Sequence, residues 1–215
     1  PNFVSEAMVA DAGGEHVKQE DGRASGDTAA PRALRADAAK NRERILEAAE
    51  ATFTAEGVSA PIDAVAQRAG VGVGTVYRHF PTKEALFEAI VTARLDELCA
   101  GTRQLAESDA PGEAVFAFLR EFGRQASAKQ DLFDAMDASG LDIKSACAAS
   151  VEELTRGIDV LLQRAKLAGA VRGDVATGEV MALIVGACHS KQEDLACQRM
   201  VEIVCEGIRK PAATG

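Results

Sequence analysis

Side chains that can donate hydrogen bonds gather in one short stretch, VGVGTVYRHFPTKEAL, over residues 71–86. Thr75 and His79 offer a hydroxyl and a ring N–H, and Arg78 and Lys83 add two cations. No Ser/His/Asp, P-loop or metal-binding motif accompanies them. The chemistry that these side chains indicate is therefore donation to phosphate oxygens and base edges.

Three helices are expected to position these donors. Apolar residues at helical spacing predict a helix over about 37–56, a second from Pro61, and a third over about 73–80. Residues 70–72, Gly-Val-Gly, predict a tight turn between the last two, because glycine readily adopts the positive φ that ends a helix. Thr82 is predicted to cap a fourth helix. This arrangement is typical of a helix-turn-helix.

The third of these helices is too short to be stable alone, so it must pack against the first two. Val73, Val76 and Phe80 are predicted to make that contact, which leaves the donors facing outward. A helix about 10–12 Å wide fits the major groove of B-DNA. The exposed face therefore predicts a surface for DNA.

The net charge of −9 counts against a polyanionic partner for the chain as a whole, but the bases are unevenly placed. Five bases and only two acids lie between Arg32 and Arg44. Residues 1–36 are predicted to form a disordered, partly basic tail, because they offer little apolar surface to bury. Arg42 and Arg44 follow the tail and are predicted to add DNA contacts.

Residues 44–90 closely resemble the DNA-binding domain of the tetracycline-repressor-like (TetR) family of bacterial regulators. The most specific matches are residues 69–71, 74–80, 83–84 and Leu86. This many positions at fixed spacing form a strong signal.

The resemblance implies two sets of DNA contacts. Phosphate oxygens would be contacted by Thr75, Tyr77, His79 and Lys83. The bases would lie nearest to Val73, Gly74 and Arg78. The chain departs from the family where a Thr or Ser commonly caps the second helix; it has Ala60-Pro61 there, with Ser59 as a substitute cap.

Further long helices are predicted over about 83–107, 111–128, 130–138, 142–168, 174–189 and 191–209. The fold is thus predicted to be all-α. The predicted domains are the tail, a helix-turn-helix domain over residues 37–84, and a larger helical domain over residues 85–215. The resemblance implies that the larger domain binds an effector and dimerises.

The last two long helices are expected to form the homodimer contact, because they are too apolar to be solvated all round. Their apolar residues are Val180, Leu183, Ile184, Ala187, Leu195, Val201, Ile203, Val204 and Ile208. A dimer presents two recognition helices, which predicts a palindromic DNA site.

Eight apolar side chains are candidates for the effector pocket, although side chains of this kind more often simply fill the core. They are Phe116, Phe118, Phe122, Phe133, Met136, Ile158, Leu162 and Met181. Small-molecule pockets are mostly apolar, so a moderately hydrophobic effector is expected.

A redox- or metal-responsive regulator is the alternative interpretation. It would use Cys188, His189, Cys197 and Cys205, but no pair has the spacing usual for zinc. Cysteines within apolar helices, Cys99 and Cys147 among them, normally act as small core residues.

No motif indicates an enzyme, a cofactor or a metal site. No apolar run approaches the roughly 20 residues that span a bilayer, and the N-terminus lacks the layout of a secretory signal. The sequence therefore predicts a cytoplasmic DNA-binding regulator, a repressor that an effector releases from its operator.

Overall fold

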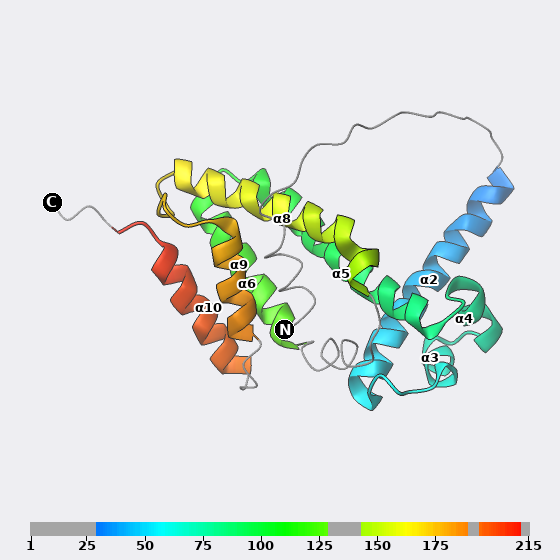
Figure 1. The fold of residues 1–215 in the computed structure, drawn as a ribbon. Helices are drawn as coiled ribbons and strands as arrows, with labels where there is room; N and C mark the ends of the chain where they lie inside the picture. Colours follow the sequence, from blue (N-terminus) through cyan, green and yellow to red (C-terminus); the bar gives the residue numbers. More distant parts are fainter. Residues whose placement is uncertain (1–28, 129–142, 189–193, 212–215) are drawn as a thin grey trace. The chain divides into compact units, whose positions relative to one another are not determined.

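The computed structural model describes residues 29–128, 143–188 and 194–211 of the 215-residue chain. These residues form helices and connecting loops and contain no strand, which confirms the predicted all-α class (Figure 1). The helices are α2 (Ala29–Glu56), α3 (Ile62–Ala69), α4 (Val73–His79), α5 (Lys83–Ala106), α6 (Pro111–Ala128), α8 (Ile143–Leu167), α9 (Thr177–Cys188) and α10 (Asp194–Ile208).

Most helix bounds lie within three residues of those predicted, and the expected helix over 130–138 lies outside the described residues. The start of α2 is the main correction. The helix begins at Ala29, inside the segment predicted as tail, whereas a start near Asp37 was expected. Pro31 is compatible with this start because the first turn of a helix needs no N–H from its residues.

The described residues group into two units that divide within α5, between Ile90 and Val91. The predicted boundary after Glu84 falls earlier in the same helix. The smaller unit contains α2, α3, α4 and the first turns of α5, and the larger one contains the remaining helices. The same helix thus contributes residues to both units.

The core of the smaller unit holds the helix-turn-helix together. Ile45 of α2 and Val65 of α3 are fully buried, and the rings of Phe53 and Phe87 lie 4.8 Å apart. Thr82 accepts a hydrogen bond from the Ala85 amide at 3.1 Å, which confirms it as the cap of α5.

In the larger unit, glycines allow the closest helix crossings. A Cβ at Gly123 of α6 would lie 2.6 Å from Val201 Cγ2 of α10, and one at Gly157 of α8 would lie 2.3 Å from Thr102 Oγ1 of α5. Both distances are far shorter than ordinary contacts. These helices can therefore pack so closely only because glycine stands at both crossings.

The loop between α8 and α9 is bound to the end of α10. The Arg172 amide donates to the Ile208 carbonyl, and the Lys210 amide donates to the Ala170 carbonyl, both at 3.0 Å. The Arg209 guanidinium lies 4.0 Å from the centre of the Phe116 ring on α6. The two hydrogen bonds hold the loop against the end of α10, and the Arg209 contact joins the same end to α6.

Candidate nucleic-acid interface

The turn between α3 and α4 has the geometry that the glycines predicted. Gly70 has φ 65° and ψ 36°, in the left-handed region. Its amide donates to Gln67 O at 3.1 Å, and the Val71 amide donates to Ala66 O at 3.0 Å. This pair of bonds is a Schellman motif, which ends α3 and leads the chain directly into α4.

Neither helix of the pair begins with a side-chain cap. Pro61 and Gly72 precede α3 and α4 in extended conformation, and neither position makes a side-chain capping bond. The interpretation of Ser59 as a substitute cap for α3 is therefore wrong. The first helical position is Ile62, so Pro61 itself occupies the cap position and supplies no hydroxyl.

Two side chains anchor α4, with 1% of Val76 and 4% of Phe80 exposed. Val73, predicted to be buried with them, is only half-buried. Tyr77 is 48% exposed, although its spacing also fits the apolar stripe. Two contacts are enough because α4 spans only seven residues, from Val73 to His79.

The opposite face of α4 presents the predicted donors together. Arg78 is exposed, and Thr75 and His79 are half-exposed. Gly74 is exposed, and a Cβ built on it would meet nothing within 4 Å. The face therefore combines a flat, open point with hydrogen-bond donors on either side, a shape that another surface can approach closely.

Lys83 is half-buried, and its ammonium contacts groups of the smaller unit. Its Nζ donates to the Ala60 carbonyl at 2.7 Å and lies 5.3 Å from the centre of the Phe53 ring and 6.0 Å from that of Phe87. Burial lowers the pKa of the ammonium, and the neighbouring Glu84 carboxylate acts in the opposite direction. Lys83 thus joins the start of α5 to the residues that precede α3.

Arg42 and Arg44, the two arginines of α2 with predicted DNA contacts, also have partners within the unit. Arg44 Nη2 donates to the Ala69 carbonyl at 2.6 Å, and the Arg42 guanidinium lies 5.4 Å from the centre of the Phe80 ring. Sequence reasoning assigned both side chains to DNA and missed these roles. The partners are about 25 and 38 residues away along the chain, so no local pattern could indicate them.

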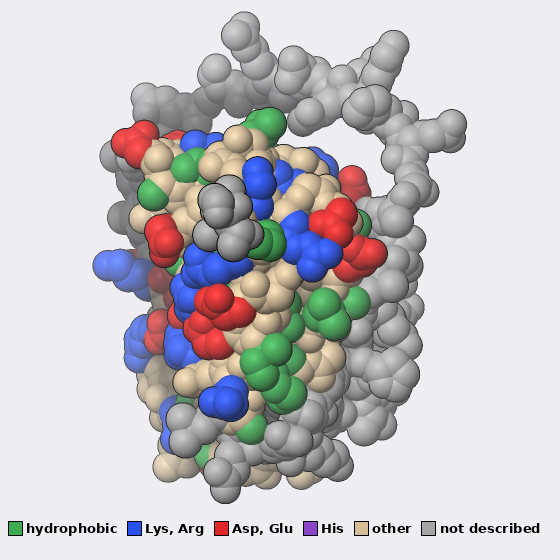
Figure 2. All heavy atoms as spheres, turned by 90° about the vertical axis from the view of Figure 1, so that its left-hand side faces the viewer, with side chains coloured by type: hydrophobic (Ala, Val, Ile, Leu, Met, Phe, Trp, Pro, Cys, Tyr) green, Lys and Arg blue, Asp and Glu red, His purple; other side chains and the backbone are tan. Residues whose placement is uncertain are grey.

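Of the eight residues predicted for the dimer contact whose burial the structure describes, two are clearly exposed. Val180, Ile184, Ala187, Val201 and Ile208 are buried within the larger unit, and Val204 is half-buried. The Leu195 side chain lies outside the described residues. Leu183 of α9 and Ile203 of α10 are 56% and 61% exposed. Figure 2 shows apolar side chains gathered beside charged ones on the side where α10 lies in Figure 1.

The described candidates for the effector pocket are core residues. Those with at most 4% exposure are Phe116, Phe118, Phe122, Ile158, Leu162 and Met181. Phe133 and Met136 lie outside the described residues. The six side chains come from α6, α8 and α9.

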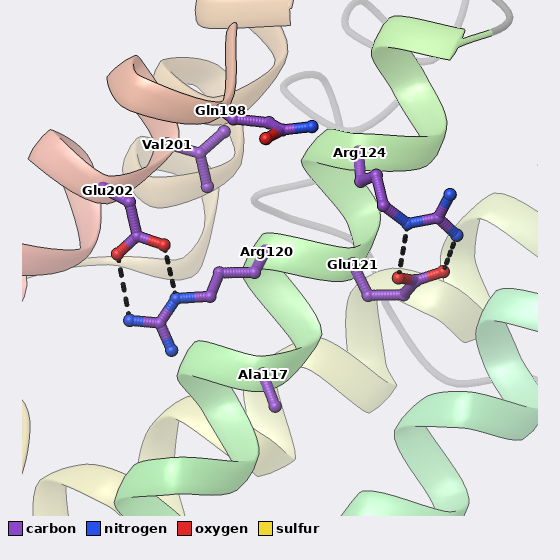
Figure 3. A pocket seen from close by; sticks show the side chains of 7 residues that line it. All are labelled: Ala117, Arg120, Glu121, Arg124, Gln198, Val201 and Glu202. Atoms are coloured by element: carbon purple, nitrogen blue, oxygen red, sulfur yellow. Dashed lines mark hydrogen bonds and ion pairs between the residues drawn. The ribbon is translucent and has the colours of Figure 1, made fainter. Parts of the chain in front are cut away.

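A separate surface hollow of about 380 Å³ lies between α6 and α10 (Figure 3). None of the six candidates that the structure describes lines it. Its lining includes Arg120 and Glu202, which form a two-bond ion pair between the helices at 2.5 and 3.0 Å. Arg124 forms a similar pair with Glu121 of its own helix. Since each charge here has a partner, the hollow differs from the apolar pocket expected for the effector.

The described cysteines are buried and have the surroundings of core residues. Burial raises the pKa of Cys99 and of Cys205 to about 11. Cys197 donates to the Gly123 carbonyl at 3.7 Å. Within the described ranges, no three His, Cys, Asp or Glu side chains are grouped to hold a metal ion. The side chain of Cys188 and the whole of His189 lie outside the part of the chain that the structure describes.

These thiols are expected to resist alkylation in the folded protein. In a Cys188→Ser chain at pH 8, iodoacetamide should leave Cys99, Cys147, Cys197 and Cys205 unmodified by mass spectrometry. All four thiols are buried, so the reagent cannot reach them, and for Cys99 and Cys205 the raised pKa of about 11 also makes the reactive thiolate scarce. The same chain in denaturant should gain four adducts. Rapid modification of the folded chain would contradict this.

Comparisons with known proteins match both parts of the chain. Residues 45–90 fit the family model described as bacterial regulatory proteins, tetR family. Residues 110–210 fit the model of the C-terminal domain of SbtR-like transcriptional regulators. An HTH-type transcriptional regulator of Staphylococcus aureus is 36% identical over 75 residues. The match spans 34% of this chain and only 40% of the length of that relative.

Solved structures match over nearly their full length. A TetR transcription regulatory protein from Mycobacterium vanbaalenii is 42% identical, with a TM-score of 0.69 over 82% of this chain and 99% of that one. The TetR transcriptional regulator SCO0520 from Streptomyces coelicolor is 34% identical, with a TM-score of 0.67 over 80% and 99%. No helix among the described residues is both long and apolar enough to cross a membrane.

Proposed function

Because this chain belongs to the TetR family of DNA-binding transcriptional regulators, which are not enzymes, we propose that it is a repressor and that a small molecule releases it from its operator. In this proposal a homodimer holds a palindromic operator in the bacterial cytoplasm, where the DNA is. The observation that supports it most directly is the outward face of α4. It presents Arg78, Thr75 and His79 around the open Gly74, while Val76 and Phe80 hold the helix from behind.

The proposed DNA contacts divide by chemistry. Arg78 reaches a base edge, with Gly74 and Val73 nearest to the bases, because an arginine fork matches guanine and glycine adds no bulk. Thr75, Tyr77 and His79 donate to phosphate oxygens. Arg42 and Lys83 add positive charge near the DNA while they remain in contact with the Phe80 ring and the Ala60 carbonyl, respectively.

The proposed dimer forms through α9 and α10. Leu183 and Ile203 are large apolar side chains that the larger unit leaves exposed, and a symmetric contact would bury both from each copy. Two copies bring two recognition helices to two half-sites, which supports a palindromic operator.

The proposed effector is a moderately hydrophobic small molecule that enters among the aromatic side chains of α6. Phe116, Phe118 and Phe122 are buried, so binding there requires the helices packed around them to move apart. Because α5 has residues in both units, such a movement can shift the recognition helices of the dimer. A changed separation no longer fits the half-site spacing.

Selection of bound fragments from random duplex DNA tests this function. The selected site is then titrated at several salt concentrations, and the titration is repeated after unfolding and refolding to remove any ligand. A palindromic site with steep salt dependence would support a dimeric operator binder. No enrichment, even with refolded protein, would overturn the proposal.

Arg78→Ala is expected to lower affinity for the selected operator by about ten- to a hundredfold and to relax the preference at one base position, since a bidentate base contact is worth about 1–3 kcal/mol. Binding is measured on the operator and on a set of single-base variants. Arg103→Ala, which removes the same charge from an exposed position in the larger unit, is the control and should bind as the wild type does. Equal loss at every variant site would contradict the assignment to a base.

A further inference from the structure

The carbonyl groups at the end of α3 lie directly before the turn that leads into the recognition helix, α4. The last four carbonyls of a helix have no partner within it. The Schellman motif satisfies those of Ala66 and Gln67. The Ala69 carbonyl, the final one of α3, receives Arg44 Nη2 at 2.6 Å. A side chain of α2 therefore completes the end of α3.

The arginine also lies against the turn itself. A Cβ built on Gly70 would lie 3.1 Å from Arg44 Nη2, so the guanidinium occupies the space beside the left-handed residue. A cation at the C-terminus of a helix is favoured by the helix dipole, and a charged donor makes a stronger bond than a neutral one. Arg44 thus connects α2 to Ala69 and Gly70, the two residues from which the path of α4 begins.

We propose that Arg44 is a positioning residue: it orients the recognition helix through the Ala69 carbonyl and does not itself contact phosphate. The inference rests on the proposed DNA-binding function of α4. It reverses the prediction from the sequence that Arg44 contacts DNA. Arg44 is exposed as a residue, but its Nη2 donates to a carbonyl within the unit. We therefore expect its removal to change the placement of α4 rather than the number of phosphates neutralised.

These two roles differ in what they do to DNA binding. A lost phosphate contact lowers the salt slope by about 0.9 and weakens operator and unrelated DNA alike. A misplaced recognition helix weakens the operator alone, because binding to unrelated DNA depends on total charge and not on base contacts.

The test compares Arg44→Met, which keeps the apolar stem, with Lys40→Met in the full-length chain. Lys40 is exposed on the same helix, so its variant controls for the loss of one charge. Affinities for the selected operator and for an unrelated duplex of equal length are measured over a series of salt concentrations. The temperature is kept well below the unfolding midpoint of each variant. Wild-type protein must first distinguish the two duplexes, so a failure of the proposed function is recognised separately.

We expect Arg44→Met to reduce the ratio of operator to unrelated affinity by about tenfold, since bonds to charged groups are among the stronger ones, while the salt slope and the unrelated affinity match those of Lys40→Met. A lower slope than that of Lys40→Met with an unchanged ratio would overturn the proposal, as would no change in either quantity.

A second variant covers the case in which Arg44→Met does not fold. Arg44→Lys keeps the charge but replaces the planar fork by a single ammonium. The proposal expects a loss of the affinity ratio of about threefold with the charge retained, because the bond to Ala69 is weakened. A ratio equal to that of the wild type would show that charge alone matters and would overturn it.

Discussion

Ile203→Glu is expected to separate the proposed dimer into monomers and to lower affinity for the selected operator by about a hundredfold or more. Ile203 is 61% exposed on α10, so glutamate is well solvated in a monomer and the fold should survive. In a symmetric contact each substitution occurs twice, and two unpaired carboxylates would lose their water. The substitution therefore raises the free energy of the dimer but not that of the monomer.

The loss of DNA affinity follows from the loss of the second half-site. In a dimer the second recognition helix binds at the high effective concentration that the first one provides, which is worth about 10²–10⁴ in affinity. A monomer retains only the contacts of one α4. Analytical ultracentrifugation and operator titration, made on the same preparation, measure the two effects.

Leu167→Glu is the matched control. Leu167 is 89% exposed at the end of α8, outside the proposed contact, and the change of charge is the same. This variant should remain dimeric and bind the operator as the wild type does. If Ile203→Glu also remains dimeric, the proposed contact through α10 is wrong.

Gly123→Ala is expected to destabilise the larger unit, although alanine favours a helix by about 1 kcal/mol over glycine. The new Cβ would lie 2.6 Å from Val201 Cγ2. Valine is stiff about χ1, so its methyl group cannot easily turn away. Overpacking of this kind costs about 1–3 kcal/mol, so the net effect should be a lower urea midpoint.

A second substitution can reverse the effect. Val201→Ala alone leaves a cavity that costs about 2 kcal/mol. In the double variant the clashing methyl is gone, and the alanine at 123 would meet the remaining Cβ of residue 201 at 3.5 Å, an ordinary contact. The double variant should therefore be more stable than the sum of the single effects by about 2 kcal/mol.

Gly101→Ala controls for helix propensity, because a Cβ there would meet nothing within 4 Å. Its urea midpoint should equal or exceed that of the wild type. Additive effects of the Gly123 and Val201 substitutions would contradict the close crossing of α6 and α10.

The sequence by itself determined the elements and the turn of the helix-turn-helix. Apolar spacing placed α3, α4 and α5, and Gly70 identified the left-handed end of α3, because both signals depend on neighbours within a few residues. The signal was weakest at α2. The predicted tail extends to residue 36, whereas α2 begins at Ala29, because the first turn of a helix accepts Pro31.

Only the tertiary structure decided what the side chains touch. Arg44 and Lys83 were assigned to DNA from their charge, yet they donate to Ala69 and Ala60, which are 25 and 23 residues away in the chain. On α9 and α10 the apolar pattern could not distinguish the buried Ile184 from the exposed Ile203. Composition and periodicity report which residues are apolar or charged, but contacts between distant segments depend on how the helices pack, and no local pattern encodes that.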